Sequence, residues 1–177
     1  DEDGGHRALH FAAKEGHTET VELLLSRGAD IEAKTNACWT PLMLAAWSGH
    51  KEAVGLLLDK GADIEVEDDS GWRALHYAAV TGCTETVELL LDREADIEAK
   101  KNDGETALSL AARNGHTETV ALLLDKGADI EARDENGYTA LIQAANKGQT
   151  ETVELLLNRG ADIEAKTNPG LTALMIT

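Results

Sequence analysis

The chain is poor in aromatic residues, proline and cysteine. Its 177 residues include three Trp, two Tyr, one Phe and two Pro, and aromatics make up 3% of the chain. A core must therefore be built from Leu, Ala, Val and Ile, which suits thin, closely packed helices better than a broad sheet sandwich. The two cysteines, Cys38 and Cys83, are too few for a disulfide framework in a chain of this length.

Basic residues are also few, and no long apolar run occurs. The balance of 33 acidic against 16 basic residues leaves a net charge of −17, which argues against nucleic acid and anionic membrane surfaces as partners. No stretch approaches the roughly 18 apolar residues that span a bilayer, and no signal peptide opens the chain. We therefore expect a cytoplasmic protein, unless a targeting segment precedes Asp1. The acidic residues are expected to keep a long apolar stack soluble.

A 33-residue period organises the whole chain. Glycines recur at this spacing at positions 16, 49, 82, 115 and 148, and the triplet Leu-Leu-Leu recurs at 23, 56, 89, 122 and 155. This spacing predicts five full units and the start of a sixth, with bounds 2–34, 35–67, 68–100, 101–133, 134–166 and 167–177. All of them form one domain, 1–177.

Each unit has the pattern of two short helices followed by a return loop. In the second unit, Thr40-Pro41 has the chemistry of a helix start, since Thr is a good N-cap and Pro loses no hydrogen bond at the first helical position. Gly49 ends this helix, and a second one is expected over 51–60. The next turn, 68–71, has the composition of a tight hairpin.

These motifs resemble ankyrin repeats. The residues that carry the resemblance are Thr40-Pro41-Leu42, His10, His76 and Gly28-Ala29-Asp30, together with Gly-His at 16, 49 and 115 and the Leu-Leu-Leu step of each full unit. The resemblance covers the entire chain. It implies an all-α solenoid of helix-turn-helix units joined by β-hairpin loops, with a concave face that binds other proteins. Each unit must stack on its neighbours to bury its apolar face.

Several residues depart from the repeat and should weaken the second and third units. Glu94 and Cys38 replace glycines at turn positions, and Glu94 is expected to cost about 1 kcal/mol if its backbone is left-handed. Gly55 interrupts a helix, also at a cost of about 1 kcal/mol. Arg7 and Arg73 replace the Thr cap.

The ends and a longer period raise the question of origin. Neither end has the polar cap that repeat arrays usually need, and Leu9, Val21 and Leu24 are expected to be exposed. We therefore expect an excerpt of a longer array. We expect a monomer that could stack end to end through its uncapped terminal units. Residues 19–25, 85–91 and 151–157 are identical, which adds a 66-residue period. Duplication of a two-unit block and a synthetic or consensus-derived origin both explain it.

Positions that change from unit to unit predict the binding surface. They precede the first helix, occupy its last turn or lie at hairpin tips, the places where ankyrin arrays contact partners by resemblance. The predicted partner-binding residues are Trp39, Trp47, Trp72, Tyr138, His6, Lys14, Arg113, Lys147, Glu105, Asp69 and Asn102.

Four of the six aromatic residues occupy these variable positions, and Trp and Tyr often anchor interfaces. Trp39 and Trp72 are equivalent residues of adjacent units and should lie roughly 10 Å apart, with Trp47 nearby. Phe11 and Tyr77 are instead expected in the core. The alternative is that the Trp rings only pack on one another.

No pattern of residues predicts catalysis, a metal site or a cofactor. The His, Glu and Asp rows repeat once per unit, which spaces them too widely for a metal and makes their environments alike, whereas acid–base pairs need unlike environments. His10 and His76 are expected to bond backbone groups, as the resemblance implies. A basic row beside the hairpins, Lys34, Lys100, Arg133 and Lys166, is interrupted by Glu67. It suggests a partner with an apolar patch flanked by acidic groups.

The sequence thus predicts a non-catalytic protein-protein interaction module. The alternative is a structural spacer array within a larger protein, or an engineered scaffold, with no dedicated ligand.

Overall fold

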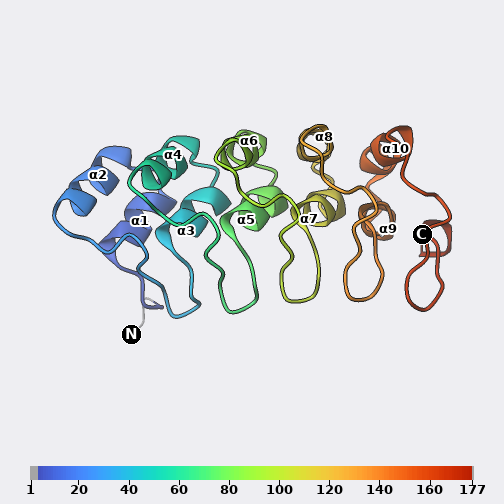
Figure 1. The fold of residues 1–177 in the computed structure, drawn as a ribbon, viewed down its shortest axis with the longest axis horizontal. Helices are drawn as coiled ribbons and strands as arrows, with labels where there is room; N and C mark the ends of the chain where they lie inside the picture. Colours follow the sequence, from blue (N-terminus) through green and yellow to red (C-terminus); the bar gives the residue numbers. More distant parts are fainter. Residues whose placement is uncertain (1–3, 177) are drawn as a thin grey trace.

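The computed structural model describes residues 4–176 as a row of stacked helix pairs (Figure 1). The first helix of each pair lies beside the loops. These inner helices are α1 (Ala8–Lys14), α3 (Pro41–Trp47), α5 (Ala74–Thr81), α7 (Ala107–Arg113) and α9 (Ala140–Asn146). The second helices form an outer row, α2 (Thr18–Ser26), α4 (Lys51–Asp59), α6 (Thr84–Asp92), α8 (Thr117–Asp125) and α10 (Thr150–Asn158). The short α11 (Ala173–Ile176) follows the last loop.

The inner helices begin with two different kinds of cap. Thr40, Thr106 and Thr139 accept a hydrogen bond from the third helical amide, as an N-cap should. Arg7 and Arg73 make no side-chain cap bond, and their own amides instead donate to Nδ1 of His10 and His76 at 2.9 and 3.0 Å. In these two helices, the His side chain three residues later accepts from the N-cap amide, as the third helical residue does in a capping box.

The core runs continuously through the stack between the two rows of helices. It consists of the Ala pairs and Leu of the inner helices and one face of the outer helices, including Val54, Leu57, Val87 and Leu90, all with no exposed surface. Neighbouring inner helices contact each other along the stack, and so do neighbouring outer helices. Small Ala side chains permit this close approach, and each unit is therefore buried by the next.

The loops are tight hairpins that point away from the outer row (Figure 1). From residue 35 onward, each is closed by two local amide-to-carbonyl bonds, such as Asp68 N to Trp72 O at 3.0 Å and Gly71 N to Asp68 O at 3.1 Å. Within residues 4–176 these loops contain no strand, and one isolated bridge joins Lys166 and Thr172. Most neighbouring hairpins are joined by a single backbone bond, for example Asn102 N to Ser70 O at 3.0 Å, which is too few for a ladder.

The strained positions are those expected from the sequence. Cys38 and Glu94 are the non-glycine residues with positive φ in the described chain, at 61° and 67°. Their equivalents in other units are glycines, which adopt this conformation without a steric cost.

The N-terminal unit corrects two expectations. Leu9 and Val21 are buried, because α3 and α4 cover them from the C-terminal side. Phe11, expected in the core, is instead 48% exposed. Its equivalents Leu44 and Tyr77 are covered by the preceding unit, and no described unit lies on that side of Phe11.

Candidate partner-binding surface

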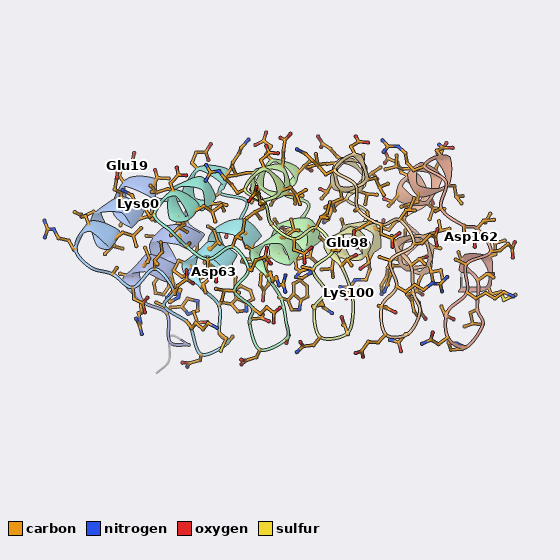
Figure 2. The ribbon with its side chains drawn as sticks, in the orientation of Figure 1. Glu19, Lys60, Asp63, Glu98, Lys100 and Asp162 are labelled. Carbon is orange, nitrogen blue, oxygen red and sulfur yellow. The ribbon has the colours of Figure 1, made fainter. Side chains whose placement is uncertain are left out.

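The predicted partner-binding residues lie on one side of the stack. We call this side the hairpin face: the loops at residues 4–6, 35–39, 68–72, 101–105 and 134–138, with the adjoining last turns of the inner helices. The side chains are shown in Figure 2, where Lys100 lies by its hairpin and Glu19 lies on the opposite, outer side. Two clusters of different chemistry lie on this face.

The first cluster is aromatic. Tyr77 lies between the two equivalent Trp residues, with ring centroids 4.5 Å from Trp39 and 5.0 Å from Trp72. Trp47 meets Trp39 edge-on at 6.0 Å and is itself 41% exposed. The predicted grouping of the three Trp residues is therefore present, and so is the packing of the rings on one another. Trp39 and Trp72 are half-buried, which leaves Trp47 as the open edge of the cluster.

Tyr77 was expected in the core and is buried there, but its position between the two Trp rings was not predicted from the sequence. It is buried, and its hydroxyl donates a short hydrogen bond to the Asp68 carboxylate. Burial and this bond raise the pKa of the Tyr77 hydroxyl above its ordinary value. The equivalent residues in the other full units are Phe11, Leu44, Leu110 and Gln143, so the position itself gave no signal of this contact. Asp68 also caps the hairpin, accepting from the amides of Ser70 and Trp72 at 2.8 and 2.9 Å.

The second cluster is ionic and centres on Glu105. This residue is 3% exposed, and its carboxylate binds Lys101 Nζ at 2.9 Å, Arg113 Nη1 at 2.7 Å and Gln143 Nε2 at 3.2 Å. Glu105 was predicted to contact a partner, but its carboxylate is engaged within the chain. Glu105 therefore holds the Arg113 guanidinium in place.

Lys101 joins the two clusters. Its ammonium group lies 5.4 Å from the centroid of the Trp72 ring and forms ion pairs with Asp103 and Glu105. Desolvation lowers the pKa of this ammonium, but hydrogen bonds and charge attraction from the two carboxylates outweigh it and raise the pKa overall. A continuous series of side-chain contacts thus runs along the face from Trp39 to Gln143.

The remaining predicted residues are distributed along the same face. His6 packs against Phe11 with ring centroids 5.3 Å apart. Asp69 and Asn102 are exposed at neighbouring hairpin tips, where the Asn102 amide donates to the Asp69 carbonyl at 3.1 Å. Lys14, Tyr138 and Lys147 line grooves on this face.

The basic row beside the hairpins has a structural role. Lys34, Lys100 and Arg133 each donate to the backbone carbonyl of the equivalent residue in the next unit, at 3.3, 3.0 and 2.6 Å. Glu67 cannot donate in this way. It instead accepts from Arg73, the residue that replaces the Thr cap, at 2.8 Å. The row therefore links neighbouring units, because these side chains already donate hydrogen bonds to carbonyl groups of the protein.

Acidic rows also link units. Glu32, Glu65, Glu98 and Glu131 each accept from the amide of an Asp in the next unit at 2.7 to 2.8 Å. On the outer helices, ion pairs such as Arg93 with Asp59 at 2.7 Å connect adjacent units. Figure 2 places Lys60, Asp63 and Asp162 away from the hairpin tips. Much of the −17 charge thus belongs to the scaffold.

The two inner-helix histidines bond backbone groups, as expected. Nε2 of His10 and His76 lies 2.8 and 2.9 Å from the carbonyls of Ala33 and Ala99. Burial lowers the pKa of both rings, which favours the neutral form, with Nε2 donating and Nδ1 accepting. Within residues 4–176, no three His, Cys, Asp or Glu side chains gather as metal ligands would. Nor is any described helix long and apolar enough to cross a membrane.

Comparison with known proteins now identifies the family. A family model for ankyrin repeats matches residues 9–101, 62–134 and 98–167. The chain belongs to the ankyrin repeat family. It is also 51% identical, over 41 residues, to the transient receptor potential cation channel subfamily A member 1 homolog of Caenorhabditis elegans. That match covers 23% of this chain and 3% of the channel homolog, so the chain spans a small part of that relative's length.

Ankyrin repeats generally mediate protein-protein interaction, and the family is typically non-enzymatic. The similarity to the channel homolog is little longer than one 33-residue unit, so it reflects the repeat.

Proposed function

We propose that this chain is a non-catalytic protein-binding module that uses its hairpin face. The observation that carries the proposal is Trp47, a large ring 41% exposed at the edge of a cluster with Trp39, Tyr77 and Trp72. An exposed aromatic ring held by its neighbours is preorganised, so a partner that covers it loses little side-chain entropy.

The spacer array is the second candidate, and one observation favours it. Trp39 and Trp72 are half-buried against Tyr77, so part of the cluster already stabilises the junction between units. In a pure spacer, all the aromatic surface would serve such packing. The monomeric state and the cytoplasmic location stay predictions.

A matched pair of variants tests the binding role. Trp47→Ala removes an exposed ring from the hairpin face, and Leu23→Ala removes an exposed apolar side chain, 54% exposed, from the outer helix α2. Proteins from a cell extract are captured on each form and on the wild type and are quantified by mass spectrometry. We expect a set of proteins to be retained by the wild type and by Leu23→Ala, and to be depleted about tenfold by Trp47→Ala.

Thermal unfolding of the three forms accompanies the capture. Since Trp47 is exposed, its replacement should lower stability by less than about 1 kcal/mol. Identical capture by all three forms would favour the spacer. Severe unfolding by Trp47→Ala would show that the ring is structural.

A further inference from the structure

The hairpin face carries two grooves at equivalent places, three units apart. The N-terminal groove, of about 390 Å³, lies between the first and second units and is lined by Lys14, Leu44, Trp39 and Trp47. The C-terminal groove, of about 450 Å³, lies between the fourth and fifth units. Four of its lining residues stand 99 positions, or three units, after those of the N-terminal groove. Arg113 corresponds to Lys14, Gln143 to Leu44, Tyr138 to Trp39 and Asn146 to Trp47. Both volumes fall within the roughly 300–1,000 Å³ range of ligand sites.

The two junctions between these grooves are filled by side chains of the protein. Tyr77 and the two Trp rings occupy the junction of the second and third units. In the next junction, Lys101 of the fourth unit lies over the ring of Trp72 of the third unit. The repeat therefore creates the same groove several times, and the variable residues decide which copies stay open.

The lining of the N-terminal groove is mainly apolar. Trp39, Trp47, Leu44 and Ala37 supply rings and methyl groups, and Lys14 adds a cation on the last turn of α1. Such a groove gains free energy by covering an apolar side chain and offers few groups for a charged one.

The C-terminal groove is polar. Its carboxylates already accept hydrogen bonds from the protein, whereas several of its donor groups make none with any described residue. Glu105 binds three donors, and Asp103 pairs with Lys101. Asp134 accepts from the amides of Asn136 and Tyr138 at 2.9 and 2.8 Å and from Gln143 Nε2 at 3.2 Å. The carboxylates that line the groove are thus already hydrogen-bonded.

The donors of this groove are available. Within residues 4–176, the Lys147 ammonium, the Tyr138 hydroxyl and the Asn146 amide make no hydrogen bond or ion pair, and Arg113 uses only Nη1. Available donors around engaged carboxylates suit an incoming acceptor, and a carboxylate forms the strongest hydrogen bonds with Lys and Arg.

We propose that the two grooves bind one extended segment of a partner protein, with an apolar side chain in the N-terminal groove and an Asp or Glu carboxylate in the C-terminal groove. This inference rests on the proposed function and specifies the partner's chemistry. Three units at about 10 Å each separate the grooves by about 30 Å. An extended chain covers that distance in about nine residues. The net charge of −17 supplies no long-range attraction for an acidic segment, so direct contacts must hold the carboxylate.

Displayed random peptides of about 16 residues are long enough to reach both grooves and provide the probe. Peptides are selected on the wild type, on Lys147→Gln/Tyr138→Phe, on Trp47→Ala and on Lys51→Gln. The double variant removes two donors that bond nothing in the free protein, so it should fold normally. Lys51→Gln is the control, because it makes the same charge change at the start of the outer helix α4, where the Lys51 side chain makes no hydrogen bond or ion pair with any described residue.

We expect peptides selected on the wild type and on Lys51→Gln to share an apolar residue and an acidic residue about nine positions apart. The double variant should lose the acidic preference and keep the apolar one, and Trp47→Ala should do the reverse. For a peptide from the wild-type pool, fluorescence anisotropy should show a Kd about tenfold weaker on the double variant. Replacing the peptide's acidic residue by its amide should weaken binding to the wild type equally and barely affect the double variant.

An apolar preference with no acidic one, or an acidic preference that the double variant keeps, would overturn the two-groove inference and leave the binding module standing. Failure of every form to enrich peptides over the bare support would overturn both proposals.

Discussion

The aromatic junction and the ionic junction occupy the same place in the repeat and are built from opposite chemistry. Trp39, Tyr77 and Trp72 fill the space between hairpins with ring contacts of 4.5 to 5.0 Å. Two units later, Glu105 and Gln143 take the places of Trp39 and Tyr77, and the buried Glu105 carboxylate, held by Lys101, Arg113 and Gln143, forms a wall of the C-terminal groove. The scaffold thus sets where a junction lies and leaves its chemistry to a few variable residues. It also means that the two junctions should respond very differently to substitution.

The largest difference should come from Glu105→Ala. Removing the buried carboxylate leaves the half-buried Arg113 and the largely buried Lys101 without their shared partner. Breaking such a pair on one side costs about 3–5 kcal/mol, and we expect a loss near the lower end because both cations can reach water or Asp103. Urea unfolding measures the change. Glu118→Ala, on the exposed side of α8, is the control and should stay within about 0.5 kcal/mol.

A loss as small as that of Glu118→Ala would mean that the ionic cluster around Glu105 contributes little to the free energy of unfolding.

Tyr77→Phe should have an intermediate effect. The ring contacts remain, and only the hydroxyl that donates to Asp68 is lost. Hydrogen bonds to charged groups contribute about 1.5–3 kcal/mol, and Asp68 keeps its two amide donors, so the lower value is expected. Unfolding followed by Trp fluorescence reports on this junction directly. A loss as large as that of Glu105→Ala would show that the aromatic junction also depends on a polar bond.

Glu94→Gly should have the smallest effect of the three, with the opposite sign. Glu94 holds φ at 67° just after α6, in the unit that carries Tyr77 and Trp72. Glycine adopts this conformation freely, so the change should raise the free energy of unfolding by about 1 kcal/mol. Gly127→Ala, at the same place in the next unit with φ at 95°, should lower it by a similar amount. Equal and opposite shifts in the urea midpoint would confirm that backbone strain at Glu94 weakens the third unit.

The periodic features were predictable because each depends on a local rule. The Thr caps and the strained Glu94 follow from spacing and residue type, and the backbone role of His10 was implied by the resemblance to ankyrin repeats. The family and the all-α class were predictable because the motifs of each unit resemble ankyrin repeats, and stacking follows because one unit cannot bury its apolar face alone.

Side-chain partners across units were not predictable in this way. Phe11 and Tyr77 occupy equivalent positions, but one is half exposed and the other is buried under rings from two hairpins. Glu105 is in sequence one more variable residue before a helix, and only the fold brings Lys101, Arg113 and Gln143 around it.

The sequence alone thus determined the repeat and the order of two helices and a return loop within each unit, because backbone propensity and apolar periodicity act over a few residues. Tertiary structure alone decided which copies of the groove are filled and which stay open. That outcome depends on side chains about 33 residues or more apart meeting across the stack, and each contact is set by the geometry of the neighbouring unit.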